Sequence, residues 1–182
     1  MEFTPFPIIE TENLLLRRMD LQDVQDIFEM RNDPRMHIYT NTNVDKNSDE
    51  TTAYIEKMNK GVDDRKWIIW AIEHKQSKKV IGSISIWNLN EEELSGELGY
   101  GIIPDFQGQG FMKEALFQVI NYGFEKMSLE ALDAYTEENN LSSIKLLETC
   151  EFKEINKVQE EGNTNHPVFQ LVVYRLLNKR KG

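Results

Sequence analysis

The chain has 182 residues, of which 40% are hydrophobic and 29% charged, and its formal net charge at pH 7 is -10. This composition is typical of a soluble globular protein, and the length suits one domain over residues 1–182. The acidic charge disfavours nucleic acid and anionic membrane lipid as partners, and no stretch approaches the roughly 20 apolar residues that span a bilayer.

The ends of the chain and its cysteine content limit the function classes further. The opening segment MEFTPFPIIETE is acidic and interrupted by prolines, so it lacks the basic start and apolar run of a secretory signal. We therefore expect a cytoplasmic protein. A single cysteine, Cys150, excludes an internal disulfide. Because the three histidines are scattered and no HExxH motif occurs, we expect no metal site.

The first elements in chain order are a strand and two helices. Asn13–Met19 predicts a short strand, and Asp20 is placed to cap a helix that ends near Asn32. The polar stretch IYTNTNVDKN predicts a loop. Ser48–Lys60 predicts a second helix, whose acidic first turn suits the helix dipole.

A set of three strands follows. Trp67–His74 and Lys79–Leu89 are rich in β-branched and aromatic residues, and the short polar break between them predicts a hairpin. Gly96–Ile103 predicts the third strand. Its Gly99 and Gly101 indicate a bulge or a splay from a neighbouring strand.

The remaining elements alternate helix and strand. An apolar face through Ala115–Phe124 predicts a long helix, Ala131–Thr136 a strand and Ser142–Thr149 a short helix. FKEINKVQ and VFQLVVYRLL predict two closing strands. The order indicates an α+β, or mixed α/β, domain with a mostly antiparallel twisted sheet of about seven strands flanked by about four helices. The helix between the third and fourth core strands implies a parallel crossover there.

The segment PDFQGQGFMKEAL places Gly108 and Gly110 in a tight turn between a strand and a helix start. Unpaired backbone N–H groups and the helix dipole favour an anion at such a turn, and phosphate or pyrophosphate is the natural ligand. The Walker pattern fails because no Lys-Ser or Lys-Thr follows the glycines. The dinucleotide GxGxxG pattern fails because Lys113 stands at its third glycine position. A simple turn is the alternative.

Two separated motifs resemble one known family. The pattern [QR]-x-x-G-x-[GA] is matched from Gln107 through Gly108, Gln109 and Gly110, with Met112 in place of the usual small last residue. The segment EENNLSSIKLLETCEF is similar to N-x-x-[AS]-x-x-x-x-E-K-x-G-F, and the matching positions are Asn140, Ser143, Glu148 and Phe152. The sequence thus resembles the GNAT superfamily of N-acyltransferases, in its RimJ/RimL branch of ribosomal-protein N-terminal acetyltransferases.

The resemblance implies a site for acetyl-CoA. The strand before the loop would splay from its parallel neighbour, so that Ile102 and Ile103 pair with the pantetheine arm. Backbone amides would hold the pyrophosphate, those of Gln109, Gly110, Phe111 and Met112. Asn140 would bind the pantetheine chain. Ser143 would contact the sulfur, because Leu147 stands at the position where many members carry a tyrosine; helix stabilisation is the alternative for Ser143.

The chemistry is attack of a neutral amine on a thioester, which needs a proton acceptor, an oxyanion donor and a proton for the leaving thiolate. Glu97 is the candidate base, directly or through water, and its alternative is an ordinary solvent-facing strand residue. Tyr100 lies on the opposite face of a regular strand, and a bulge at Gly99 would bring it beside Glu97. Cys150 is interpreted as a packing residue.

The acceptor is an amine bound by the first two helices and the last hairpin, as the resemblance implies. An acidic wall there would attract a cationic amine or a protein N-terminus. Trp67, Trp70 and Trp87 either line this cleft or belong to the core. The leading hypothesis is acetylation of a protein α-amine. The alternatives are a small amine, such as a polyamine, amino acid or antibiotic, and a non-catalytic acyl-CoA sensor. The branch implies a possible homodimer.

Overall fold

The computed structural model describes residues 3–179, so the outermost residues of the predicted domain lie outside it. One eight-stranded sheet has the order β1-β2-β3-β4-β5-β6-β8-β7. Its strands are β1 Ile9–Glu10, β2 Leu14–Arg17, β3 Ile68–His74, β4 Lys79–Asn90, β5 Ser95–Ile102, β6 Ala131–Glu137, β7 Lys153–Glu161 and β8 Val168–Leu177. The helices are α1 Val24–Asn32, α2 Ser48–Asp63, α3 Phe111–Glu125 and α4 Leu141–Thr149, with 3-10 turns at Leu21–Asp23, Pro34–His37 and Pro104–Phe106.

The predicted mixed α/β architecture is confirmed, with one strand more than expected. The additional strand, β1, pairs with β2 over only two residues, which is too short for a periodic pattern to reveal. Asp20 caps as predicted, accepting a hydrogen bond from Gln22 N, but the element that it starts is a 3-10 turn leading into α1. Asn47 caps α2 by accepting from the amides of Asp49 and Glu50.

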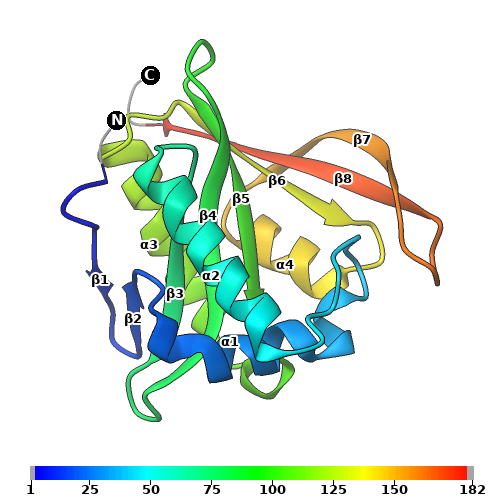
Figure 1. The fold of residues 1–182 in the computed structure, drawn as a ribbon. Coiled ribbons are helices and arrows are strands. Elements are labelled where there is room, and N and C mark those ends of the chain that lie inside the picture. The colour runs from blue at the N-terminus through cyan, green and yellow to red at the C-terminus, as the bar shows by residue number, and fades with distance from the viewer. Residues whose placement is uncertain (1–2, 180–182) are drawn as a thin grey trace.

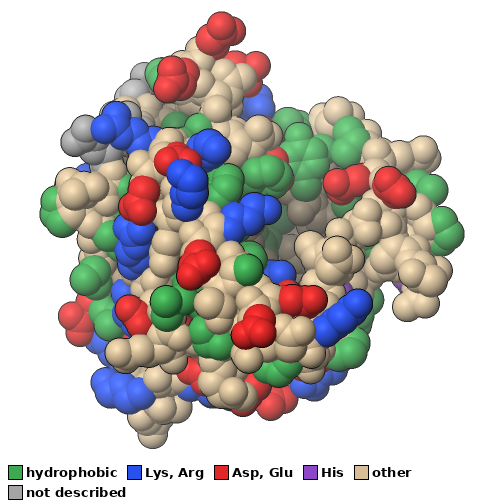
Figure 2. Space-filling view, viewed as in Figure 1, with side chains coloured by type: hydrophobic (Ala, Val, Ile, Leu, Met, Phe, Trp, Pro, Cys, Tyr) green, Lys and Arg blue, Asp and Glu red, His purple; other side chains and the backbone are tan. Residues whose placement is uncertain are grey.

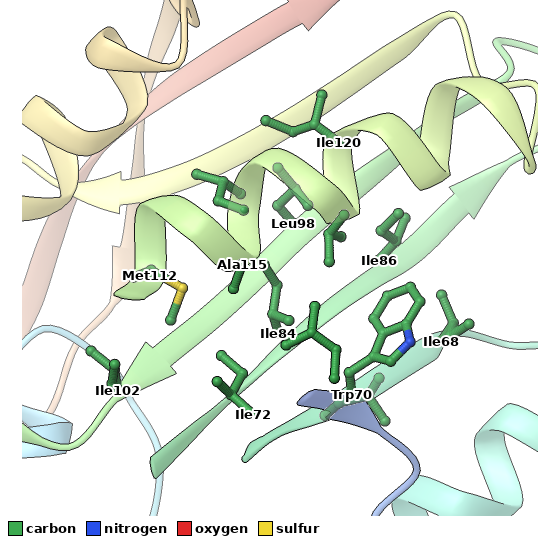
Figure 3. Close-up of a cluster of buried hydrophobic side chains, with 14 of the residues drawn as sticks. Ile68, Trp70, Ile72, Ile84, Ile86, Leu98, Ile102, Met112, Ala115 and Ile120 are labelled. Carbon is green, nitrogen blue, oxygen red and sulfur yellow. The ribbon is translucent and has the colours of Figure 1, made fainter. Parts of the chain in front are cut away.

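Helices cover both faces of the sheet, α1 and α2 on one face and α3 and α4 on the other (Figure 1). On the α3 side, Ile84, Ile86 and Leu98 pack against the helix around Ala115 (Figure 3). Successive residues of a strand point to opposite faces, so the other face of β4 carries Ser83 and Ser85 in place of large apolar groups. Small side chains at the centre of the α1–α2 face leave room there for a cleft.

The sheet opens between β5 and β6. These strands pair in parallel, as predicted, but the pairing runs only from Ser95 with Ala131 to Leu98 with Ala134. Beyond that point β6 stays paired with β8, whereas β5 runs toward the loop before α3. A gap therefore separates the ends of β5 and β6 (Figure 1). The expected splay is therefore present. Within residues 3–179, no helix is long and apolar enough to cross a membrane.

Candidate active site

The splayed end of β5 presents free backbone groups toward the gap. The Ile103 amide donates to Ile81 O on the β4 side at 2.8 Å. Because backbone groups alternate along an antiparallel pair, the N–H groups of Tyr100 and Ile102 point to the β6 side, where no strand pairs with them. The expectation that Ile103 supplies this edge is therefore wrong, since its amide is already used by β4. Gln107 Nε2 donates to Ile102 O at 2.9 Å and ties the loop to the strand end.

The glycine turn has the backbone of an anion site. Gly108 has φ 72° and Gly110 has φ 85°, conformations that favour glycine. Gly110 is the N-terminal cap of α3 and provides no side chain to the helix. The amides of Gln109 through Met112 have no hydrogen-bond acceptor in the described part of the chain. Together with the dipole of α3, they fit a pyrophosphate.

Tyr100 and Ser143 meet at the gap. The Tyr100 hydroxyl lies 2.8 Å from Ser143 Oγ, which joins β5 to α4 across the splay. Burial raises the pKa of Tyr100 to about 12, against the opposing effect of the Ser143 hydrogen bond, so Tyr100 keeps its proton at neutral pH. A half-buried, protonated hydroxyl at this position can act as a general acid.

The first turn of α4 is held by Asn140. Its Oδ1 accepts from Ser143 N at 3.3 Å and from Ser142 Oγ at 3.2 Å. Ser143 Oγ is therefore not used for capping, and it remains in contact with Tyr100. Only the amide nitrogen of Asn140 can reach a ligand without breaking the cap. Leu147 is fully buried in the core, and it offers no polar atom where the family motif often has tyrosine.

Glu97 lies on the α1–α2 face of β5, opposite Trp87 on β4. Asn88 Nδ2 donates to its Oε2 at 3.3 Å. Burial raises the pKa of Glu97, the Asn88 hydrogen bond opposes this, and the nearby carboxylates of Asp133 and Glu160 add to it. A raised pKa suits a general base that works near neutral pH.

The expected bulge at Gly99 is wrong. The register between β4 and β5 runs without a shift from Gly82 with Ile102 to Trp87 with Glu97, and the irregularity lies beyond Trp87. A Cβ at Gly99 would meet Ser85 Oγ at 2.8 Å, so close packing against β4 accounts for the glycine. Glu97 and Tyr100 consequently face opposite sides of the sheet.

A cleft of about 560 Å³ lies between the sheet and the helices α1 and α2. Figure 2 shows a hollow between the main body and the β7–β8 lobe, with hydrophobic side chains gathered in it. The cleft is lined mainly by apolar and small residues: Met30, Arg31, Met36, His37, Thr40, Thr42, Tyr54, Lys57, Met58, Trp67, Ile69, Ser83, Ser85, Trp87, Gly99, Tyr100 and Gly101. Because Tyr100 belongs to this lining, the cleft reaches the splay.

The charge of this lining differs from the expectation. No aspartate or glutamate is among the lining residues, whereas Arg31 and Lys57 are. The acidic wall expected from the net charge is therefore wrong, because no carboxylate belongs to the lining. Asp45 is paired with Arg31, and Glu97 lies on the same face of β5 but outside the lining. Trp67 and Trp87 line the cleft, and Trp70 is core, with its Nε1 donating to Pro7 O at 2.7 Å.

An ion pair stands beside the cleft, and of its two members Arg31 belongs to the lining while the buried Asp45 does not. Arg31 donates to both carboxylate oxygens of Asp45, at 2.7 and 3.0 Å, and its guanidinium stacks 3.7 Å above the ring of Tyr54. Burial opposes the charge of Asp45, but hydrogen bonds from Arg31 and Thr51 hold the pKa of that carboxyl below its usual range. Sequence reasoning missed these residues. The local sequence signal for this part of the cleft is the spacing of Tyr54 and Met58, which lie four residues apart and therefore on one face of α2.

Cys150 fits its interpretation as a packing residue. It is half-buried beside the core. Burial raises the pKa of its thiol, although Lys113 opposes the shift, so the reactive thiolate form is disfavoured.

Comparison with known proteins agrees with this geometry. A family model described as an acetyltransferase (GNAT) domain matches residues 13–153. The uncharacterized N-acetyltransferase YoaA of Bacillus subtilis (strain 168) is 27% identical over 176 residues, which cover 97% of this chain and 99% of that protein. A spermidine N(1)-acetyltransferase of Vibrio cholerae serotype O1 is 26% identical over 148 residues, covering 81% and 83%.

A solved structure has the same fold. RimL, a ribosomal L7/L12 alpha-N-protein acetyltransferase in complex with coenzyme A, gives a TM-score of 0.84 at 16% identity, covering 94% of this chain and 98% of RimL. The splay, the glycine loop and the family match over most of the chain agree. This chain belongs to the GNAT acetyltransferase family and is an N-acetyltransferase that uses acetyl-CoA.

Proposed function

We propose that the protein acetylates the α-amine at the N-terminus of a protein or peptide. The observation that carries this proposal is the cleft, which reaches Tyr100 at the splay and is hollowed toward solvent beside the β7–β8 lobe. A chain terminus can enter such a cleft while the rest of the acceptor stays outside. The likeness in fold to RimL supports the same type of acceptor.

The residues of this chain supply binding and proton transfer. Acetyl-CoA, when bound, supplies the thioester carbonyl that the amine attacks. The amides of Gln109 through Met112 would hold its pyrophosphate, and the free N–H groups of Tyr100 and Ile102 its pantetheine arm.

Glu97 would accept a proton from the amine, through water, because its carboxylate lies on the cleft face of β5 but outside the lining of the cleft. Tyr100 would protonate the leaving sulfur, and Ser143 would hold the Tyr100 hydroxyl in position.

A polyamine fits the cleft poorly. Acceptors with several positive charges are normally bound by carboxylates, and the lining contains Arg31 and Lys57 in place of acidic residues. A non-catalytic sensor would not need the half-buried Tyr100 and Ser143 hydroxyls to face each other at the splay.

The test is release of free thiol from acetyl-CoA with peptides, small amines and a peptide blocked at its N-terminus. We expect turnover with free N-termini and none with the blocked peptide, and mass spectrometry should place the acetyl group on the α-nitrogen. Turnover confined to small amines would refute the proposal. Binding of acetyl-CoA without turnover of any amine would favour the sensor.

We further propose that residues 1–182 act as one domain in the cytoplasm. We also propose a homodimer, as the resemblance to the RimJ/RimL branch implies. Sedimentation velocity at micromolar concentration tests the dimer, and a single monomeric species would refute it.

A further inference from the structure

We propose that the residue carrying the acceptor amine has a large, uncharged, apolar side chain that fills a methionine-lined pocket in the cleft. This pocket is formed by Met30, Met36, Met58 and Trp67 above the floor residues Ser83 and Ser85. The inference rests on the proposed function for the position of the amine, and it adds the class of acceptor.

The pocket lies beside the reacting centre. Met36 comes from the 3-10 turn after α1, and a Cβ built on Gly101 would lie 3.2 Å from Met36 Cε. The neighbouring residue on β5 is Tyr100, which lines the same cleft and contacts Ser143. A group bound near Met36 is therefore attached close to the amine that reacts at the splay.

The walls made by the three methionines and Trp67 offer an apolar surface to an acceptor. Trp67 Nε1 donates to Met58 O at 3.1 Å, so its polar atom is already bonded. Methionine side chains are flexible and polarizable, and they adapt to large apolar groups of differing shape. The floor stays open because Ser83 and Ser85 occupy positions where β-strands often carry larger residues.

Three polar residues of the lining, His37, Thr40 and Thr42, are joined by hydrogen bonds. His37 Nε2 lies 2.9 Å from Arg31 O, which only accepts, so this nitrogen carries the proton. His37 Nδ1 lies 2.6 Å from Thr42 Oγ1, and Thr40 Oγ1 lies 2.7 Å from the same hydroxyl. These hydrogen bonds occupy polar groups of His37, Thr40 and Thr42, so none of these three residues requires a polar side chain on the acceptor.

The charges exclude a basic side chain. Arg31 is held by Asp45 and stacks on Tyr54, Lys57 has no partner among residues 3–179, and no carboxylate lines the cleft. A lysine or arginine side chain of the acceptor would lose water on entering the pocket, and no carboxylate of the lining would compensate its charge. An uncharged apolar group meets no such cost.

The experiment compares two series of acceptors that differ only in the first side chain. One series is tetrapeptides X-Ala-Ala-Ala, and the other is free amino acids X, with Met, Leu and Phe set against Gly, Ala and Lys. Complete burial of a large apolar side chain corresponds to a preference of about tenfold to a hundredfold in kcat/KM over Ala. We expect this preference in whichever series is turned over.

The two series separate the inference from the proposed function. Turnover of free amino acids alone, with the apolar preference, would refute the N-terminal acceptor and support the pocket. If peptides that begin with Ala, Gly or Lys are acetylated as efficiently as those that begin with Met or Phe, the inference of an apolar acceptor pocket is wrong. The proposed function would not be affected by that result.

A variant places the preference in this pocket. Ser83→Leu fills the floor, so the ratio of kcat/KM for Met over Ala acceptors should fall at least tenfold. Ser48→Leu, an exposed position at the start of α2 and outside the lining, is the matched control and should keep the ratio. Calorimetric binding of CoA by both variants confirms that they fold. An unchanged ratio in a folded Ser83→Leu variant would overturn the assignment.

Discussion

Replacement of Glu97 by glutamine tests the proposed base directly. Positioned general bases contribute about 10²–10⁴-fold, so kcat/KM at pH 7 should fall by that factor, about 3 to 5 kcal/mol in activation free energy. Glutamine has the same shape and its amide oxygen can still accept from Asn88, which lies 3.3 Å from the present carboxylate. The affinity for CoA should not change, because its expected contacts are backbone groups of the loop before α3 and of Tyr100 and Ile102, not the Glu97 side chain.

The pH dependence supplies a second readout. The pKa of Glu97 is raised above its ordinary value of 4.5, mainly by burial, so the acid limb of kcat/KM should lie above pH 4.5 and disappear in the variant. A carboxyl with a raised folded pKa contributes stability that is present below its unfolded pKa and lost as pH rises through the folded value. Glu97→Gln should therefore be at least as stable as the parent at pH 7.

The assay is the initial rate of thiol release across pH 5–9, with thermal unfolding of both proteins at pH 7. A large loss of activity in a variant of equal stability and equal CoA affinity supports the base. A rate within threefold of the parent would refute this reasoning, and so would a loss of activity that follows from unfolding.

Four further results are expected. Tyr100→Phe should lower kcat about a hundredfold with little change in CoA affinity, and adding Ser143→Ala should cost little more, because Ser143 acts through Tyr100; additive losses in steady-state kinetics would contradict this. Gly110→Ala should raise the Kd for CoA about fivefold to thirtyfold, since a left-handed φ of 85° costs other residues roughly 1–2 kcal/mol; unchanged calorimetry would exclude the loop amides. Spermidine should not be acetylated, because the cleft lacks carboxylates; measurable turnover would refute that argument. Glu151→Gly should stabilise the protein by about 0.5 to 1 kcal/mol in urea unfolding, because relief of φ 69° exceeds the entropy that glycine adds to the unfolded chain; a destabilised variant would show that the exposed ion pair with Lys179 matters more.

Local patterns in the sequence determined the elements and the cofactor loop. Runs of β-branched and aromatic residues identified the long strands, and Asp20 identified the start of the first helical segment. The left-handed backbone at Gly108 and Gly110 follows from glycine itself, because a residue without a Cβ adopts a positive φ at no steric cost. No distant contact is needed. The strand β1 was missed because two residues carry no periodic pattern.

Only the tertiary structure decided the acceptor side of the site. Tyr100 and Ser143 are 43 residues apart, and they meet because β5 and β6 stop pairing after Leu98. The net charge of -10 suggested an acidic cleft, yet net charge says nothing about which residues face inward. The cleft is lined by two helices, a 3-10 turn, two loops and three strands, so its apolar and cationic character is a property of their packing and not of any one segment.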